Sequence, residues 1–70
     1  MTTGVELTVN GEARTLGAGA TLAALLDELG VEPRGVAVAV DGEVVPRRSW
    51  ADRALAGGEH VEILSIAQGG

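Results

Sequence analysis

With 70 residues the chain is long enough for one domain, and a body of this size buries only about 60% of the surface that its unfolded chain exposes. The absence of cysteine and the presence of one histidine exclude disulfides, a thiol nucleophile and a zinc site. Ten acidic residues against five arginines give a net charge of −5, which excludes nucleic acid as the expected partner and favours basic protein partners.

The first predicted element is a β-hairpin near the start of the chain. Apolar and polar residues alternate from Val5 to Val9, which is the period of a half-buried strand. Asn10-Gly11 follows at once, and this pair is typical of a type I′ turn, which needs positive φ at both central positions. The returning strand, Glu12 to Leu16, is polar and is therefore expected at or near a sheet edge.

One amphipathic helix is predicted next. Its leucines recur at positions 22, 25, 26 and 29, the i, i+3, i+4, i+7 spacing of a single apolar stripe. Thr21 is a suitable N-cap, because its hydroxyl can accept from a free N–H of the first turn. Gly30 is expected to end the helix in the left-handed conformation, and Pro33 prevents the helix from resuming.

A second hairpin follows the helix. The valines and alanines of Val36–Val40 suit a strand whose alternate valines face the helix. Asp41-Gly42 predicts a second type I′ turn. The return strand, Glu43 to Val45, is short, and Pro46 places it at a sheet edge because proline has no N–H to donate.

The stretch between this hairpin and the last strand holds a short helical turn. Ser49 with Asp52 resembles a capping box around Trp50, which is expected to cover the core rather than to bind a ligand. Three arginines, at positions 47, 48 and 53, concentrate positive charge here. They form either a solvated face or a partner contact, since arginine is favoured at interfaces.

The last strand, His60 to Ile66, is expected at the centre of the sheet, because it is apolar on both faces. This order of elements predicts an α+β, ubiquitin-like β-grasp fold, with a mixed sheet of four to five strands and one main helix across one face. The opposite face, with Ala37, Ala39, Leu64 and Ile66, is left uncovered. It is a candidate docking surface, with cover by the chain end or self-contact as the alternatives.

The chain ends in Gln68, Gly69 and Gly70. Glycines leave the main chain thin and permissive, so the terminal carboxylate can be threaded into another protein's active site. It is ionised at neutral pH, because an α-carboxyl group titrates at roughly 3.3–3.7, and the anion can attack the α-phosphate of ATP. A frayed end gives the same pattern. The expected single domain therefore has a folded body, 4–66, and a flexible tail, 67–70.

The remaining features predict a cytoplasmic chain that is monomeric when free. No apolar run approaches the ~20 residues of a membrane span, and Met1 to Gly4 do not begin a signal peptide, so no membrane partner is expected. His60, beside Glu59 and without a second ligand or base, is expected to be an ordinary strand residue.

Several segments resemble the ThiS family of ubiquitin-like sulfur carriers. They are VNGE at 9–12, AVAVDGEVVPRRSW at 37–50, the Gly-Gly-acidic turn before VEIL, and the closing SIAQGG. The resemblance spans Val5 to Gly70, and its most distinctive parts are VVPR at 44–47 and the diglycine end.

This resemblance implies a carrier of thiamine (thiazole) biosynthesis that is a cosubstrate and not an enzyme. A ThiF-type enzyme adenylates the Gly70 carboxylate with ATP, and sulfur from cysteine, through a desulfurase, converts it to a thiocarboxylate that donates sulfur to the thiazole synthase ThiG. The carrier needs no cofactor and no metal, because ATP and the cysteine-derived sulfur are used by its partners. Its expected partner-binding residues are Gln68, Gly69, Leu64, Ile66 and Arg47.

Two alternatives stay open from the sequence. The same fold and diglycine end serve carriers of other pathways, as in the small subunit of molybdopterin synthase or in cysteine synthesis, although the molybdopterin family has more helix between its hairpins. A β-grasp interaction module with no covalent role is the other alternative.

Overall fold

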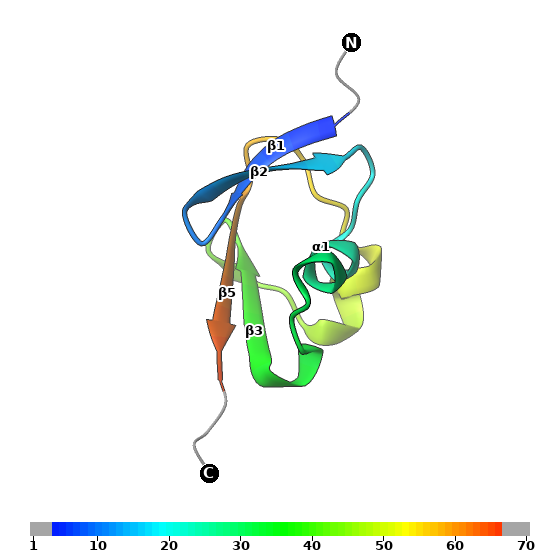
Figure 1. The fold of residues 1–70 in the computed structure, drawn as a ribbon. Coiled ribbons are helices and arrows are strands. Elements are labelled where there is room, and N and C mark those ends of the chain that lie inside the picture. Colours follow the sequence, from blue (N-terminus) through cyan, green and yellow to red (C-terminus); the bar gives the residue numbers. More distant parts are fainter. Residues whose placement is uncertain (1–3, 67–70) are drawn as a thin grey trace.

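The computed structural model describes residues 4–66, which form a five-stranded mixed sheet with one α-helix across one face (Figure 1). The strand order is β2-β1-β5-β3-β4, and β1 and β5 are the parallel pair. This confirms the predicted α+β order and the central place of the last strand. The elements are β1 (Gly4–Val9), β2 (Glu12–Gly17), α1 (Leu22–Leu29), η1 (Pro33–Gly35), β3 (Val36–Val40), β4 (Glu43–Val44), η2 (Arg47–Asp52) and β5 (His60–Ser65).

Both hairpins turn where the sequence predicts. Asn10 and Asp41 each have φ of 50°, and the glycines that follow them, Gly11 and Gly42, have φ of 85° and 84°. Positive φ at both central positions is the type I′ geometry, whose twist matches that of the flanking strands. The two hairpins therefore supply the outer strands, and β2 and β4 lie at the sheet edges as expected.

The predicted caps fix the two ends of α1. Thr21 is extended, and its hydroxyl accepts from the N–H of Ala24 at 3.2 Å. Gly30 is left-handed, with φ of 71°, and its N–H donates to the carbonyl of Asp27 at 3.1 Å. The helix has eight residues, and within residues 4–66 no helix has the length and apolar content needed to cross a membrane.

The core lies between α1 and the sheet face that α1 covers. Its buried members come from every layer of the body: Leu7, Val9, Leu16, Leu22, Leu25, Leu26, Val38, Val40, Trp50, Leu55 and Val61. Trp50 is 5% exposed, and its indole N–H donates to the carbonyl of Val45 at 2.8 Å, which confirms its expected place over the core. A buried indole with a satisfied N–H adds apolar area without the cost of an unpaired donor.

The capping box expected at Ser49 is wrong. The short helix η2 is a 3₁₀ helix that begins at Arg47, directly after Pro46, and no side chain caps it. Ser49 lies inside this helix, where its N–H donates to the carbonyl of Pro46 at 2.8 Å. Proline has a fixed φ, here −63°, that suits the residue before a helical turn, so the turn starts earlier than the serine.

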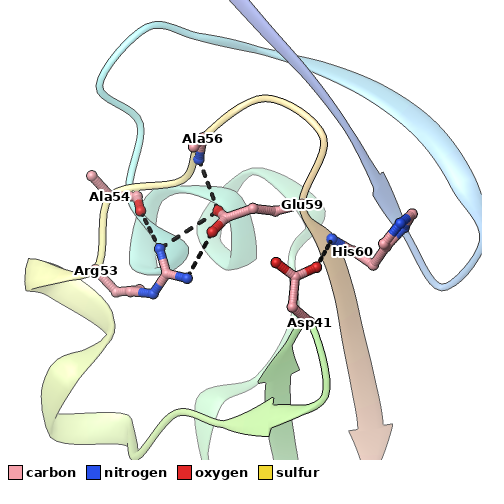
Figure 2. Close-up of polar contacts among 6 residues, drawn as sticks. All are labelled: Asp41, Arg53, Ala54, Ala56, Glu59 and His60. Carbon is pink, nitrogen blue, oxygen red and sulfur yellow. Dashed lines mark hydrogen bonds and ion pairs between the residues drawn. The ribbon is translucent and has the colours of Figure 1, made fainter.

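An ion pair closes the loop that leads into β5 (Figure 2). Arg53 Nη2 donates to Glu59 Oε2 at 2.8 Å, and Arg53 Nη1 donates to the carbonyl of Ala54. The other carboxylate oxygen of Glu59 accepts from the N–H of Ala56 at 2.8 Å. Hydrogen bonding to Arg53 lowers the pKa of Glu59 below its ordinary value, with a further contribution from the Ala56 N–H, while partial burial opposes the change.

Glu59→Gln is expected to lower the free energy of unfolding at pH 7 by about 1 kcal/mol, the scale of a charged hydrogen bond at a partly exposed site. Because the folded-state pKa of Glu59 is the lower one, this contribution is complete above the unfolded value, roughly 4.3, and is lost as pH falls through the folded value. Urea titrations from pH 7 to pH 3 should therefore converge for the two proteins at the acid end. A difference that persists undiminished at pH 3 would contradict this assignment.

Candidate functional site

The strand β5 carries the chain from the core toward its carboxyl end. It pairs with β3 along its length, from Val40↔Val61 to Val36↔Ser65, and Ile66 N–H donates to the carbonyl of Gly35 at 2.8 Å. The chain therefore keeps its place beside β3 as far as Ile66, although β5 itself ends at Ser65. Figure 1 shows this end of β5 leading away from the β1–β2 hairpin.

Three large apolar side chains are exposed on the sheet face opposite α1. Val44 is 73%, Leu64 58% and Ile66 54% exposed, and no other large apolar residue of 4–66 is counted as exposed. Strand pairing sets Leu64 opposite the half-buried Ala37, and Figure 1 shows no other described element over this face of β3 and β5. We call Val44, Leu64, Ile66 and Ala37 the outer patch.

The structure corrects the predicted patch at Ala39. This residue is only 9% exposed, because it pairs with Val44 on one side and with Glu62 on the other, and longer side chains flank its methyl group. Val44 belongs to the exposed face as well, although its sequence context did not predict it there. The register of the Asp41-Gly42 hairpin held the signal, since it sets Val44 opposite Ala39 and hence on the same face.

The other predicted site residues are not brought to the outer patch. Arg47 is exposed at the start of η2, outside the strand pairs that carry the patch. Of the three arginines of this stretch, Arg53 serves the ion pair with Glu59, so it is held within the fold. Gln68, Gly69 and Gly70, which carry the predicted chemistry, lie outside the described residues, as does the predicted tail, 67–70.

His60 has a partner that the sequence did not indicate. Its Nδ1 and the hydroxyl of Thr8 hydrogen-bond at 2.8 Å, and the two residues are direct neighbours in the β1–β5 pairing. A nucleophile that works through histidine also needs a group that orients the ring, and among residues 4–66 no carboxylate hydrogen-bonds the imidazole. The pair is therefore a cross-strand contact on the sheet surface.

The described body thus presents an apolar face and a strand that leads to the chain end. Between residues 4 and 66, no three His, Asp or Glu side chains gather in a way that could hold a metal ion. Two hollows of the described residues, about 190 Å³ beside Glu6 and His60 and about 360 Å³ between Arg14 and Val31, are open to solvent. The described residues therefore offer the outer patch for docking, and the predicted reactive group, the carboxylate of Gly70, lies outside them.

Comparisons with known proteins agree with this geometry. The model of the ThiS family matches residues 7–70. The sulfur carrier protein ThiS of Thermus thermophilus is 44% identical over 62 residues, which cover 89% of this chain and 95% of that protein. The sulfur carrier protein ThiS of Escherichia coli is 29% identical over 66 residues, which cover 94% of this chain and 100% of that protein.

A larger protein and a solved structure also match. A thiazole synthase of Paramagnetospirillum magneticum is 44% identical over 66 residues, which cover 94% of this chain but only 20% of that protein's length. The crystal structure of a thiamine biosynthesis protein (ThiS) from Geobacter metallireducens superposes with a TM-score of 0.82 at 32% identity, covering 94% of this chain and 100% of that one. This likeness confirms the predicted β-grasp fold.

Proposed function

This chain belongs to the ThiS family, and from that premise we propose that it is the sulfur carrier of thiamine (thiazole) biosynthesis, acting through the carboxylate of Gly70. The observation that carries the proposal is the family match, which runs from residue 7 through the diglycine end at residue 70. The similarity to two sulfur carrier proteins over nearly their whole length supports it.

The proposed chemistry takes place in partner enzymes. In a ThiF-type enzyme, a carboxylate oxygen of Gly70 attacks the α-phosphorus of ATP, and pyrophosphate leaves with the electrons of the broken P–O bond. A cysteine desulfurase holds the sulfur taken from cysteine as a persulfide, whose terminal sulfur attacks the acyl carbon and expels AMP. A thiol reductant then cleaves the S–S bond of the resulting acyl disulfide, giving up two electrons and becoming a disulfide itself. The product is a thiocarboxylate in which sulfur replaces one oxygen. The chain is thus a cosubstrate and not an enzyme, and it holds no cofactor of its own.

A thiazole synthase of the ThiG type is the proposed acceptor of the sulfur. The supporting observation is that a thiazole synthase is similar to this chain over 20% of its own length. That synthase therefore carries a segment similar to this chain within its own polypeptide. Such a fusion is expected when a carrier and a synthase work together. Gln68 and Gly69 are proposed to contact both partners where the chain end enters their active sites. Gly69 suits this place because a glycine has no side chain to obstruct a narrow channel.

The outer patch is the proposed docking surface for these partners, and the exposed Arg47, which lies outside the patch, is a further proposed contact. Exposed apolar side chains on one face release water when a partner covers them. The acidic surface that accompanies a net charge of −5 favours partners with basic side chains around an apolar centre. The body would then dock by its sheet while β5 directs the chain end.

Leu64→Ala is expected to weaken binding to the adenylating enzyme about tenfold or more, the scale of a well-buried interface residue, with the free energy of unfolding changed by less than about 0.5 kcal/mol. The stability should hold because Leu64 is 58% exposed in the free protein. Titration calorimetry measures the first quantity and urea unfolding the second. Thr15→Ala is the matched control, an exposed residue on the edge strand β2. Equal affinity of both variants for the adenylating enzyme would show that the outer patch is not part of the interface.

Intact-mass analysis tests the proposed function. The protein is incubated with ATP, a ThiF-type enzyme, cysteine, a desulfurase and a thiol reductant, and the mass is expected to show one oxygen replaced by sulfur at Gly70. Addition of a thiazole synthase with its other substrates should then return the carboxylate mass. Thiocarboxylate that only a molybdopterin synthase or a cysteine synthase consumes would assign the carrier to another pathway. An unchanged mass would favour a non-covalent interaction module.

A further inference from the structure

The side chain of Asn10 holds the last strand beyond the point where β1 leaves it. The β1–β5 pairing ends at Val9↔Val61, and the N–H of Asn10 donates to the carbonyl of Val61 at 2.8 Å. Asn10 Oδ1 then accepts from the N–H of Ile63 at 2.8 Å, and its Nδ2 donates to the carbonyl of Ile63 at 3.3 Å. One carboxamide thus gives β5 the donor and the acceptor that a longer β1 would supply.

The corresponding residue of the other hairpin makes half of this contact. Asp41 has the same φ of 50°, and its Oδ1 accepts from the N–H of His60 at 2.9 Å (Figure 2). The carbonyl of His60 already accepts from the N–H of Asp41 at 2.8 Å, so only an acceptor is required there. A carboxylate suffices at position 41, whereas position 10 needs a group that both accepts and donates, which an amide provides and a carboxylate does not.

The two contacts act at different ends of β5. Asp41 binds the first residue of the strand, while Asn10 binds Ile63, close to where the chain leaves the sheet. Past Val61, the backbone pairing of β5 is with β3 on one flank, and the Asn10 amide supplies the contact at Ile63 on the flank toward β1. Contacts to β3 on one flank and to Asn10 on the other hold the direction of β5. With β3 alone, β5 could pivot about its hydrogen bonds to β3.

We propose that Asn10 is a positioning residue that fixes the direction in which β5 leaves the sheet, and thereby aligns the Gly70 carboxylate in the partner's active site. The inference rests on the proposed function, since it concerns the same carboxylate. Attack on a phosphorus atom requires the reacting atoms at near-contact distance and in line, and a misplacement of about 1 Å can cost on the order of 10²-fold in rate. Asn10 contacts neither partner nor ATP in this role.

Asn10→Gly tests the inference, with Asp41→Gly as its matched control. Both changes keep a residue that readily adopts positive φ in the turn and remove one side-chain contact to β5. The assay is ATP–pyrophosphate exchange by a ThiF-type enzyme with the full chain as the varied substrate. We expect Asn10→Gly to lower kcat about tenfold with KM within about twofold of wild type, because docking is unaffected and alignment is lost. Asp41→Gly should leave both constants within about twofold.

A readout that does not depend on activity accompanies the assay. Amide hydrogen exchange of Ile63 should speed up in Asn10→Gly and not in Asp41→Gly, because only the first variant frees that N–H. If circular dichroism shows Asn10→Gly unfolded, Asn10→Asp replaces it, since a carboxylate keeps the acceptor and loses the donor. Asn10→Asp should also lower kcat and leave KM unchanged.

Several outcomes would overturn the inference. They are a folded Asn10→Gly or Asn10→Asp protein with wild-type kcat, a rise in KM alone, and an equal loss of kcat in Asp41→Gly, which would indicate general weakening of the sheet. A wild-type chain that is not adenylated at all would remove the proposed function, and this inference with it. A loss of adenylation confined to the Asn10 variants leaves the proposed function intact.

Discussion

Removal of Gly70 is expected to abolish thiocarboxylate formation while the fold stays unchanged. The shortened chain still ends in a carboxylate, on Gly69, but one residue spans about 3.5 Å of extended chain, so the anion falls short of the α-phosphate by that distance. Because a misplacement of the reacting atoms by about 1 Å can lower the rate on the order of 10²-fold, adenylation should fall to background. Intact mass after reaction measures the loss, and circular dichroism with urea unfolding checks the fold.

A chain with Gly70 as a C-terminal amide distinguishes the effect of chain length from the effect of the carboxylate charge. It has the full length, but an amide carries no anionic oxygen at neutral pH, so it should also fail to form the adenylate. Deletion of residues 1–3 is the control, since the family match begins only at residue 7 and this deletion should leave thiocarboxylate formation unaffected. Turnover by the amide at the wild-type rate would refute the assignment of the carboxylate as the working group.

The features that the sequence predicted well are those that depend on neighbouring residues. A type I′ turn requires positive φ at two adjacent positions, so Asn10-Gly11 and Asp41-Gly42 located both hairpins. The cap at Thr21 is equally local, because its hydroxyl reaches an N–H three residues on. The central place of β5 followed from its own pattern, apolar on both faces.

The features that the sequence did not predict depend on register across strands. The burial of Ala39 requires knowledge that Val44 and Glu62 flank it, and a strand's own pattern does not identify its neighbours on either side. The contact from Asn10 to Ile63 joins residues 53 apart in sequence, and its partner is fixed only by the parallel pairing of β1 with β5. The wrong prediction at Ala39 and the unforeseen contact of Asn10 have the same cause, because the neighbouring strands set the environment of a side chain in a sheet.

The charged residues show the same division. Arg53 lies close in sequence to two other arginines and was predicted to share their role, whereas the loop folds it back onto Glu59, six residues on. No periodicity signals such a contact, because an irregular loop has no fixed spacing. The candidate docking surface was therefore predicted at Leu64, which lies in β5, and at Ile66, which follows it. Attack of the Gly70 carboxylate on ATP was inferred from the diglycine end and its conversion to a thiocarboxylate from the resemblance to a family, and both remain predictions.

Leu25→Ala is expected to unfold a large fraction of the protein at 25 °C. Leu25 has no exposed surface, and removal of a fully buried leucine side chain costs about 2–5 kcal/mol when the core cannot close the cavity. A core in a chain of this size rarely supplies more than about 3–5 kcal/mol in total, so the two quantities are comparable. The burial of Leu25 in the core between α1 and the sheet is thus expected to account for much of the free energy of unfolding.

Urea unfolding followed by circular dichroism measures this effect, with Leu64→Ala as the matched control. Both variants lose the same atoms from a leucine, but Leu64 is 58% exposed and its truncation leaves no cavity, so its midpoint should stay at the wild-type value.

The two variants also distinguish two causes of lost function. Leu25→Ala should lose sulfur transfer because the folded population falls, and high concentrations of a binding partner should restore part of it by mass action. Leu64→Ala should lose it as a fully folded protein. A wild-type midpoint for Leu25→Ala would show that the core does not depend on the helix stripe.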